Sequence, residues 1–107
     1  MDMFYALAEP TRREIIEMLA KNGQLSASDI SEKFPVSPPA ISQHLKVLRE
    51  ANMVRMEKRA QRRLYQINPQ AMLELEKWAK EMTQLWKERF DSLDTLLKTE
   101  KAKARIR

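Results

Sequence analysis

The segment SPPAISQHLKVLREANMV, residues 37–54, constrains the fold more than any other part of the chain. Ser37 is a favourable N-cap, and Pro38 suits the first helical position, where its missing N–H costs no hydrogen bond. In the helix that follows, apolar residues recur at i, i+4 and i+7: Ile41, Leu45 and Leu48. A polar stripe lies about 100° further round the axis. The segment therefore predicts a helix with one stripe on a protein core and another facing a polar partner.

Composition limits the fold to a small, mainly helical domain. The 107 residues are 43% hydrophobic and 33% charged and include a single glycine, Gly23, which argues against an all-β fold rich in turns. The absence of Cys excludes disulfides and thiol catalysis. No apolar run approaches the roughly 18 residues of a membrane span, and the first residues do not resemble a signal peptide. We therefore expect a soluble, cytoplasmic protein without a membrane partner.

Three helices are predicted before residue 37. Residues 2–8 form a short apolar helix that ends before Pro10, and Pro10 opens an amphipathic helix that stops at Asn22 and Gly23. Ser26, followed three residues later by an Asp, predicts a capping box for a short third helix that ends at the proline of the turn FPVS. This helix, the turn and the helix after Ser37 make a helix-turn-helix pattern, whose second helix enters the major groove of DNA.

A basic β-hairpin is predicted next. Residues 53–57 and 64–67 alternate like strands and are joined through KRAQRR, while residues 55–63 contain five basic groups and one acid. A helix-turn-helix followed by such a hairpin predicts a winged helix. Its basic side chains would reach phosphates or the minor groove: Lys58, Arg59, Arg62 and Arg63. Arg12 and Arg13 are either further phosphate contacts or surface ion pairs.

From residue 69 the sequence follows one long helical pattern with an apolar seam of heptad spacing. The seam comprises Met72, Leu75, Ala79, Met82, Trp86, Phe90, Leu93 and Leu97. Residues 70–97 would span roughly 42 Å, which is longer than a small domain needs, so the seam predicts packing on a second subunit. Trp78 and Trp86 form either dimer core or an aromatic pocket for an apolar effector, and the basic tail after Lys98 is expected to fray. The predicted domains are residues 1–68 and 69–107.

The stretches LAEPTRREIIEMLA, SQHLKVLREA and KRAQRRLYQI closely resemble the ArsR-type (arsenic-repressor-like) winged-helix repressors of bacteria and archaea. The resemblance covers about residues 3–68, and the long Trp-bearing helix is similar to the metal-independent autorepressors of that family. It implies a homodimer, built from the first and last helices, that binds a palindromic operator. The implied interface comprises Phe4, Leu7, Leu75, Trp78, Met82, Trp86, Phe90, Leu93 and Leu97.

The resemblance also places the base-facing positions at Pro39, Ser42 and Gln43, with His44 beside them. His44 is either a half-buried packing residue or a hydrogen-bonding contact to DNA. With the basic residues of the second helix and the wing, the predicted DNA-binding set is Ser37, Pro39, Ser42, Gln43, His44, Lys46, Arg49, Lys58, Arg59, Arg62 and Arg63.

Three features depart from the family pattern. Pro35 stands where Gly is usual, so the turn must close without a positive φ. The wing has no Gly near its tip, which predicts a longer, mobile loop in place of a tight two-residue turn. The segment LSASDIS has no Cys, and His44 is the only His, so neither a metal site nor a cofactor is predicted.

Catalysis finds no support in the residue inventory. Ser42 and His44 lie about 200° apart on the helix and cannot form a nucleophile and base pair, and the chain has no Gly-rich phosphate loop. The leading hypothesis is a homodimeric, sequence-specific DNA-binding repressor that is not an enzyme, with or without a small-molecule effector. The alternative is a winged-helix protein-interaction module without specific DNA binding.

Overall fold

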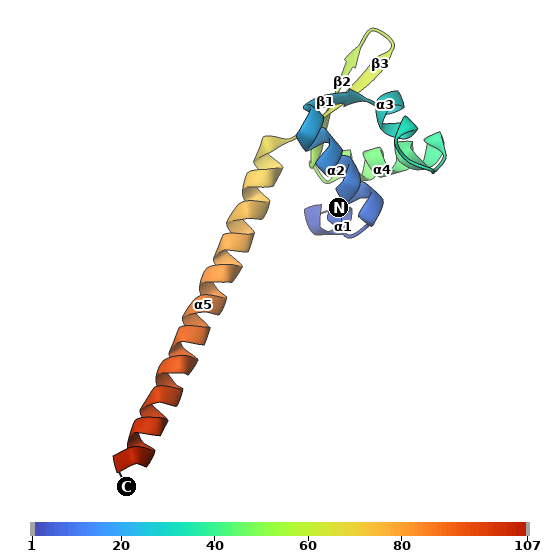
Figure 1. Cartoon of the computed structure of the whole chain (residues 1–107). Coiled ribbons are helices and arrows are strands. Elements are labelled where there is room, and N and C mark those ends of the chain that lie inside the picture. The colour runs from blue at the N-terminus through green and yellow to red at the C-terminus, as the bar shows by residue number, and fades with distance from the viewer. Residues whose placement is uncertain (1, 107) are drawn as a thin grey trace. The chain divides into compact units, whose positions relative to one another are not determined.

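The computed structural model describes residues 2–106, and the side chains of residues 2–103. Its elements, labelled in Figure 1, are α1 (Met3–Leu7), α2 (Pro10–Asn22), β1 (Gln24–Ser26), α3 (Ala27–Glu32), α4 (Pro38–Glu50), β2 (Val54–Arg59), β3 (Arg62–Ile67) and α5 (Pro69–Ile106). The fold is mainly helical with a small antiparallel sheet, as predicted. The chain divides into two compact units, Met1–Met72 and Leu73–Arg107.

The helix ends lie where the capping residues predict them. Ser37 accepts a hydrogen bond from the backbone N–H of Ala40 at the start of α4. Gly23 closes α2 with φ 84°, in the left-handed region that glycine adopts without a steric penalty. Asn52, the second residue after α4, also has a positive φ, of 59°. Local sequence chemistry therefore sets the lengths of α2 and α4.

The turn between α3 and α4 closes without a left-handed residue, as Pro35 requires. The Lys33 N–H donates to the Ile30 carbonyl, and the Phe34 N–H donates to the Ser31 carbonyl. Both bonds lie before Pro35, so the proline is not required to donate at the end of α3. The helix-turn-helix is thus completed by carbonyls at the end of α3.

The sheet has three strands in the order β1-β3-β2, all antiparallel. The strand β1 was not predicted, because three residues are too few for an alternating pattern to show. The prediction of a longer wing loop was wrong. Arg59 pairs with Arg62, so Ala60 and Gln61 alone connect β2 to β3, and Ala60 adopts φ 57°. A single alanine can enter the left-handed region at a cost of about 1 to 2 kcal/mol, which the six-residue strands can offset.

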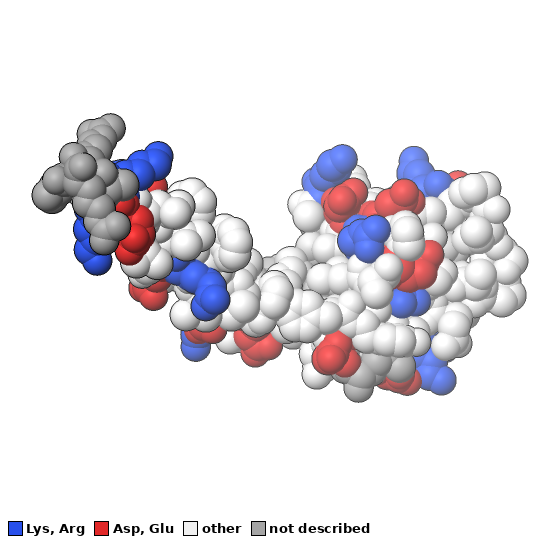
Figure 2. All heavy atoms as spheres, turned by 90° about the horizontal axis from the view of Figure 1, so that it is seen from below, with Lys and Arg blue, Asp and Glu red and all other residues white. Residues whose placement is uncertain are grey.

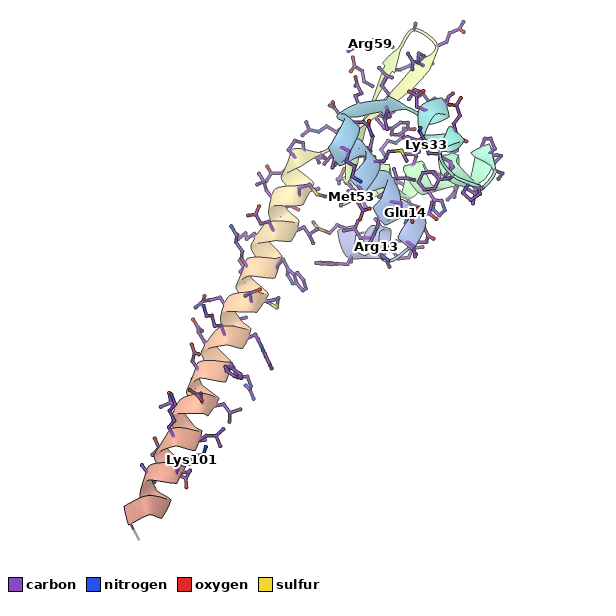
Figure 3. All side chains as sticks on the ribbon, viewed as in Figure 1. Arg13, Glu14, Lys33, Met53, Arg59 and Lys101 are labelled. Carbon is purple, nitrogen blue, oxygen red and sulfur yellow. The ribbon has the colours of Figure 1, made fainter. Side chains whose placement is uncertain are left out.

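The core of the first unit lies between α2, α4 and the sheet. Its largest fully buried side chains are Ile15, Leu19, Ile30, Ile41, Leu45, Leu48 and Met53. Figure 3 labels Met53 among the side chains of this unit. Tyr65 of β3 and Ala71 near the start of α5 are also buried. The apolar stripe predicted for residues 41–48 is therefore a core stripe.

The second unit is the continuation of α5, which runs to Ile106. The helix continues past Lys98, with ion pairs from Lys98 to Asp94 at 3.1 Å and from Lys103 to Glu100 at 3.9 Å; the expected fraying of the basic tail stays a prediction. Pairs at i,i+4 and i,i+3 stabilise a helix by a few tenths of a kcal/mol each, about 0.2 to 0.5. In residues 2–106, no helix is long and apolar enough to cross a membrane.

The capping box of α3 allows a test of this local chemistry. The Asp29 N–H donates to Ser26 Oγ at 3.1 Å, and the Ser26 N–H donates to Asp29 Oδ2 at 3.3 Å. Ser26→Ala should lower the free energy of unfolding by about 1 kcal/mol in a urea titration. Ser28→Ala, an exposed serine in the same helix, should change it by less than about 0.5 kcal/mol. Equal losses would contradict the capping role.

Candidate nucleic-acid interface

The helix α4 separates apolar from polar side chains as predicted. Ile41, Leu45 and Leu48 are each no more than 1% exposed, whereas Ser42 and Gln43 are exposed. Lys46 and Arg49 are exposed on the same polar side. Because the apolar stripe is buried, the polar stripe has to face out of the protein.

The wing carries basic side chains on the same face of the hairpin that packs on the core at its base. Alternation and register put Met56, Lys58, Arg63 and Tyr65 on one face of the hairpin, with Met56 opposite Tyr65 and Lys58 opposite Arg63. Tyr65 is 6% exposed, whereas Lys58 and Arg63 are exposed. One face of the wing therefore changes from apolar at its base to basic towards its end.

A hollow of about 360 Å³ lies where this face meets α4. The α4 side chains around it are Pro39, Ser42, Gln43, Lys46 and Arg49, and the wing contributes Arg63 and Tyr65. Six of the predicted DNA-binding residues thus line one concave surface. The two-residue loop keeps the strands in register out to Arg59 and Arg62, so the hairpin extends as a regular ladder beside this hollow.

The wing cations fall into two groups by their ion pairs. Arg59 pairs with Glu57 at 3.2 Å, and Arg62 lies 3.5 Å from Asp29. Within the described side chains, no carboxylate lies within 4.0 Å of the remaining four cations of the predicted set, which are Lys46, Arg49, Lys58 and Arg63. Figure 3 labels Arg59 beside the wing. Sequence reasoning did not separate these groups: the Arg59–Glu57 pair is two residues apart on β2, and the Arg62–Asp29 pair depends on the tertiary contact between α3 and the wing.

The carboxylate that pairs with Arg62 belongs to Asp29, which forms the capping box of α3 with Ser26. Hydrogen bonds from the Ser26 side chain and from its backbone N–H hold the pKa of Asp29 below the ordinary value of 3.8. Asp29 is therefore ionised at neutral pH, and it lines a small hollow with Gln61 and Arg62. The ion pair between Asp29 and Arg62 therefore links the start of α3 to the wing.

Two predicted residues have structural partners. The Ser37 hydroxyl serves as the N-cap of α4. His44 is half-buried, with Nδ1 3.3 Å from Arg12 Nη1 and 3.9 Å from Glu9 Oε2. Desolvation acts to raise the pKa of Glu9, but the Arg12 N–H and the other groups facing it outweigh this, and the pKa stays below 4.5.

Arg12 does not lie where a phosphate contact requires. It is 9% exposed, and its guanidinium bonds to backbone carbonyls and to His44. The interpretation of Arg12 as a phosphate contact was wrong, because its charge is directed into the protein. Arg13 is exposed and donates to the Leu7 carbonyl at 2.7 Å. Helical periodicity separates the two arginines, because Arg12 has i, i+3, i+4, i+7 spacing with the buried Ile15, Ile16 and Leu19, whereas Arg13 does not.

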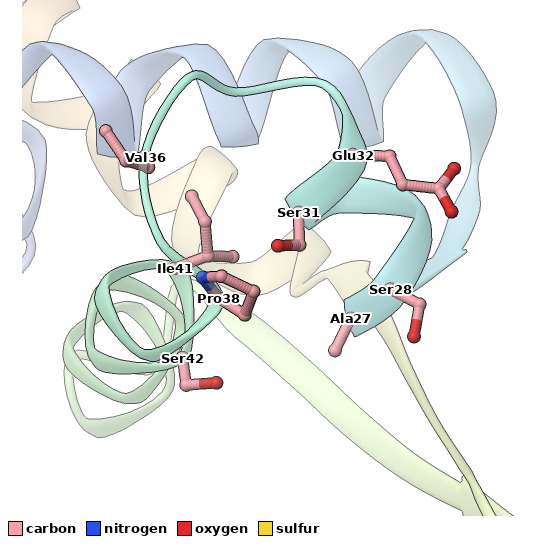
Figure 4. Close-up of a pocket in the computed structure, with 8 residues that line it drawn as sticks. All are labelled: Ala27, Ser28, Ser31, Glu32, Val36, Pro38, Ile41 and Ser42. Carbon is pink, nitrogen blue, oxygen red and sulfur yellow. The ribbon is translucent and has the colours of Figure 1, made fainter.

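A second hollow, of about 520 Å³, opens between α3 and α4. Figure 4 shows its lining residues: Ala27, Ser28, Ser31, Glu32, Val36, Pro38, Ile41 and Ser42. Its one charged side chain is acidic, so it is unsuited to a phosphate. Among the side chains that the structure describes, no three His, Cys, Asp or Glu residues gather as metal ligands.

Comparison with known proteins agrees with this geometry. The family model described as "Bacterial regulatory protein, arsR family" matches residues 9–56. The transcriptional repressor SdpR of Bacillus subtilis (strain 168) is 35% identical over 77 residues, which cover 72% of this chain and 84% of that protein. The chain belongs to the ArsR family.

Two further comparisons differ in how much of the chain they cover. The regulator Rv2034 of Mycobacterium tuberculosis (strain ATCC 25618 / H37Rv) is 46% identical over 70 residues, covering 65% of this chain and 64% of that protein. A solved ArsR-like transcriptional regulator from Rhodococcus sp. RHA1 matches with a TM-score of 0.79 and 25% identity, covering 90% of this chain and 87% of that chain. The winged helix is thus the ArsR fold, while the family model ends at Met56 and leaves most of the wing outside it.

The sorting of the wing cations predicts different roles for two arginines. Arg63→Gln should reduce the salt dependence of DNA binding by about one unit of slope for each bound chain, because each chain loses one phosphate contact. Arg59→Gln removes the same charge from the opposite face, where Glu57 already holds it, and should change the slope much less. Binding measured by fluorescence anisotropy over a salt series tests this. A larger change for Arg59→Gln would contradict the assignment.

Proposed function

We propose that this ArsR-family chain is a sequence-specific DNA-binding transcriptional repressor that acts as a homodimer on a palindromic operator. The observation that carries the proposal is the hollow between α4 and β3, where exposed polar side chains lie next to cations that have no acidic partner among the side chains of residues 2–103. DNA needs both features on one surface, since phosphate contacts supply affinity and base contacts supply selectivity.

The residues divide between these two tasks. Lys46, Arg49, Lys58 and Arg63 neutralise phosphates along the edges of the groove. Ser42 and Gln43 lie near the N-terminal end of α4 and read base edges there. A glutamine amide can donate to N7 and accept from N6 of adenine, a pattern that the major groove presents uniquely. Arg59 and Arg62 add charge nearby but first have to leave Glu57 and Asp29.

A second copy of the chain is the proposed partner of α5. On the face of α5 seen in Figure 2, charged side chains lie between uncharged stretches. Trp86, Phe90 and Leu93 are 68%, 58% and 53% exposed, and exposed apolar surface of this extent marks an interaction site. A two-fold dimer would present its two α4 helices to half-sites about 34 Å apart. The palindromic operator follows from that symmetry.

We further propose that the bound protein represses transcription. We also propose that it acts in the cytoplasm, together with the DNA. SdpR is named a transcriptional repressor, and a dimer seated on its operator blocks transcription by occupying the site. The sequence has no Cys and a single His, so metal or cofactor chemistry has no part in the proposal. Any effector would be a small molecule of another kind.

The test begins with selection of a duplex from a random pool, followed by anisotropy with that duplex and a scrambled one. Gln43→Ala should cost about 1 to 3 kcal/mol on the selected duplex and relax preference at one position of each half-site. Gln70→Ala, an exposed glutamine at the start of α5, is the matched control and should bind like the wild type.

Equal losses by Gln43→Ala on both duplexes would remove Gln43 from the base-reading residues. Failure of the wild-type protein to select any duplex would favour a winged-helix protein-interaction module instead.

The dimer is tested on α5. Trp86→Glu places a charge within the apolar face and should convert the dimer to a monomer at micromolar concentration in sedimentation velocity, because an unpaired buried charge is strongly disfavoured. Lys87→Glu introduces the same side chain one position away, on the charged side of the helix, and should leave the dimer intact. A wild-type monomer at high concentration would contradict the proposed partner.

A further inference from the structure

Arg12 is a buried cation that joins two elements of the first unit. Its Nε donates to the Ala6 carbonyl at 2.7 Å, and Nη2 donates to the Tyr5 carbonyl at 3.2 Å, so one end of the guanidinium holds the last turn of α1. The guanidinium carbon also lies 5.5 Å from the centre of the Tyr5 ring. The remaining arm, Nη1, reaches His44 of α4.

The chemistry of the pair assigns the proton on His44. A guanidinium has only donors, so His44 Nδ1 has to accept from Arg12 at 3.3 Å, which places the ring proton on Nε2. Glu9 Oε2 accepts from the backbone N–H of Arg12 at 3.0 Å and lies 3.9 Å from the same Nδ1. The Arg12 guanidinium thus bonds to two carbonyl oxygens of α1 and to the His44 imidazole, and the Glu9 carboxylate lies nearby.

The hydrogen bond between Arg12 and His44 gives α4 a directional contact, which its apolar stripe lacks. Ile41, Leu45 and Leu48 hold the helix by burial, which depends little on direction, whereas a hydrogen bond has a preferred distance and angle. His44 directly follows Gln43, so a bond that fixes the His44 ring limits how far the helix can rotate about its axis at that point. Rotation would move Gln43 away from a base edge.

We propose that Arg12 is a positioning residue that acts through His44: it fixes the rotation of α4 and so directs Ser42 and Gln43 towards the bases. The inference rests on the proposed DNA-reading function and adds a residue that does not itself touch DNA. Because Arg12 also holds the end of α1, the orientation of α4 depends on the seating of α1.

The test is a double-mutant cycle read on two duplexes, the selected one and its scrambled version. His44→Phe keeps a ring without an acceptor, and Arg12→Gln removes the guanidinium. Each should weaken binding to the selected duplex about tenfold and leave the scrambled duplex within about twofold. The double variant should also lose about tenfold, because both changes break one contact. Lys21→Gln, which removes an exposed cation from the last turn of α2, is the matched control and should bind like the wild type.

A rescue separates positioning from direct contact with DNA. His44→Asn places Oδ1 two bonds from Cβ, as Nδ1 is, and offers an acceptor to Arg12 without the Nε2–H. It should bind the selected duplex within about threefold of the wild type. Circular dichroism checks that each variant is folded. If Arg12→Gln does not fold, the comparison of His44→Phe with His44→Asn carries the test alone, since both keep Arg12.

Losses that multiply in the double variant would overturn the inference, and so would an Asn variant as weak as the Phe variant. Either result would assign His44 a contact of its own with DNA. Selective binding that survives every substitution would overturn the inference while leaving the proposed function in place. Only a wild-type protein without duplex selectivity would remove the proposed function itself.

Discussion

The burial of one stripe of α4 is the interaction on which the rest of the structure depends. Ile41, Leu45 and Leu48 contribute to a core shared with α2, α3 and the sheet, and each would cost about 2 to 5 kcal/mol if truncated to alanine. Because that stripe is buried, the polar stripe is the part of α4 that is exposed. Ser42, Gln43 and Lys46 face outward because their neighbours cannot.

The central strand β3 connects the same core to the basic surface. It pairs with β1 on one side and β2 on the other, and its alternation directs Tyr65 into the core and Arg63 into the hollow beside α4. A shift of register by one residue would exchange these faces, so that Arg62 would replace Arg63 beside the recognition helix and would lose its contact with Asp29 of α3. Stability and charge placement therefore depend on the register of one strand, β3, in its two ladders.

The elements with strong local signals could be predicted from sequence. Ser37 and Pro38 determine where α4 starts, and Gly23 determines where α2 ends. Tertiary features could not be predicted in this way. Two residues sufficed for the wing loop because long strands offset the strain at Ala60, and the sorting of Arg59 from Arg63 requires the register. The buried charge of Arg12 depends on carbonyls and an imidazole that only folding brings together.

The central claim is that α4 and one face of the wing form a single DNA-reading surface. It is tested most directly by NMR titration of the backbone amides with a selected duplex. The largest shift changes should fall at residues 39–46 and 58–63, with small changes in the second unit. Changes confined to α5, or to α3, would contradict it.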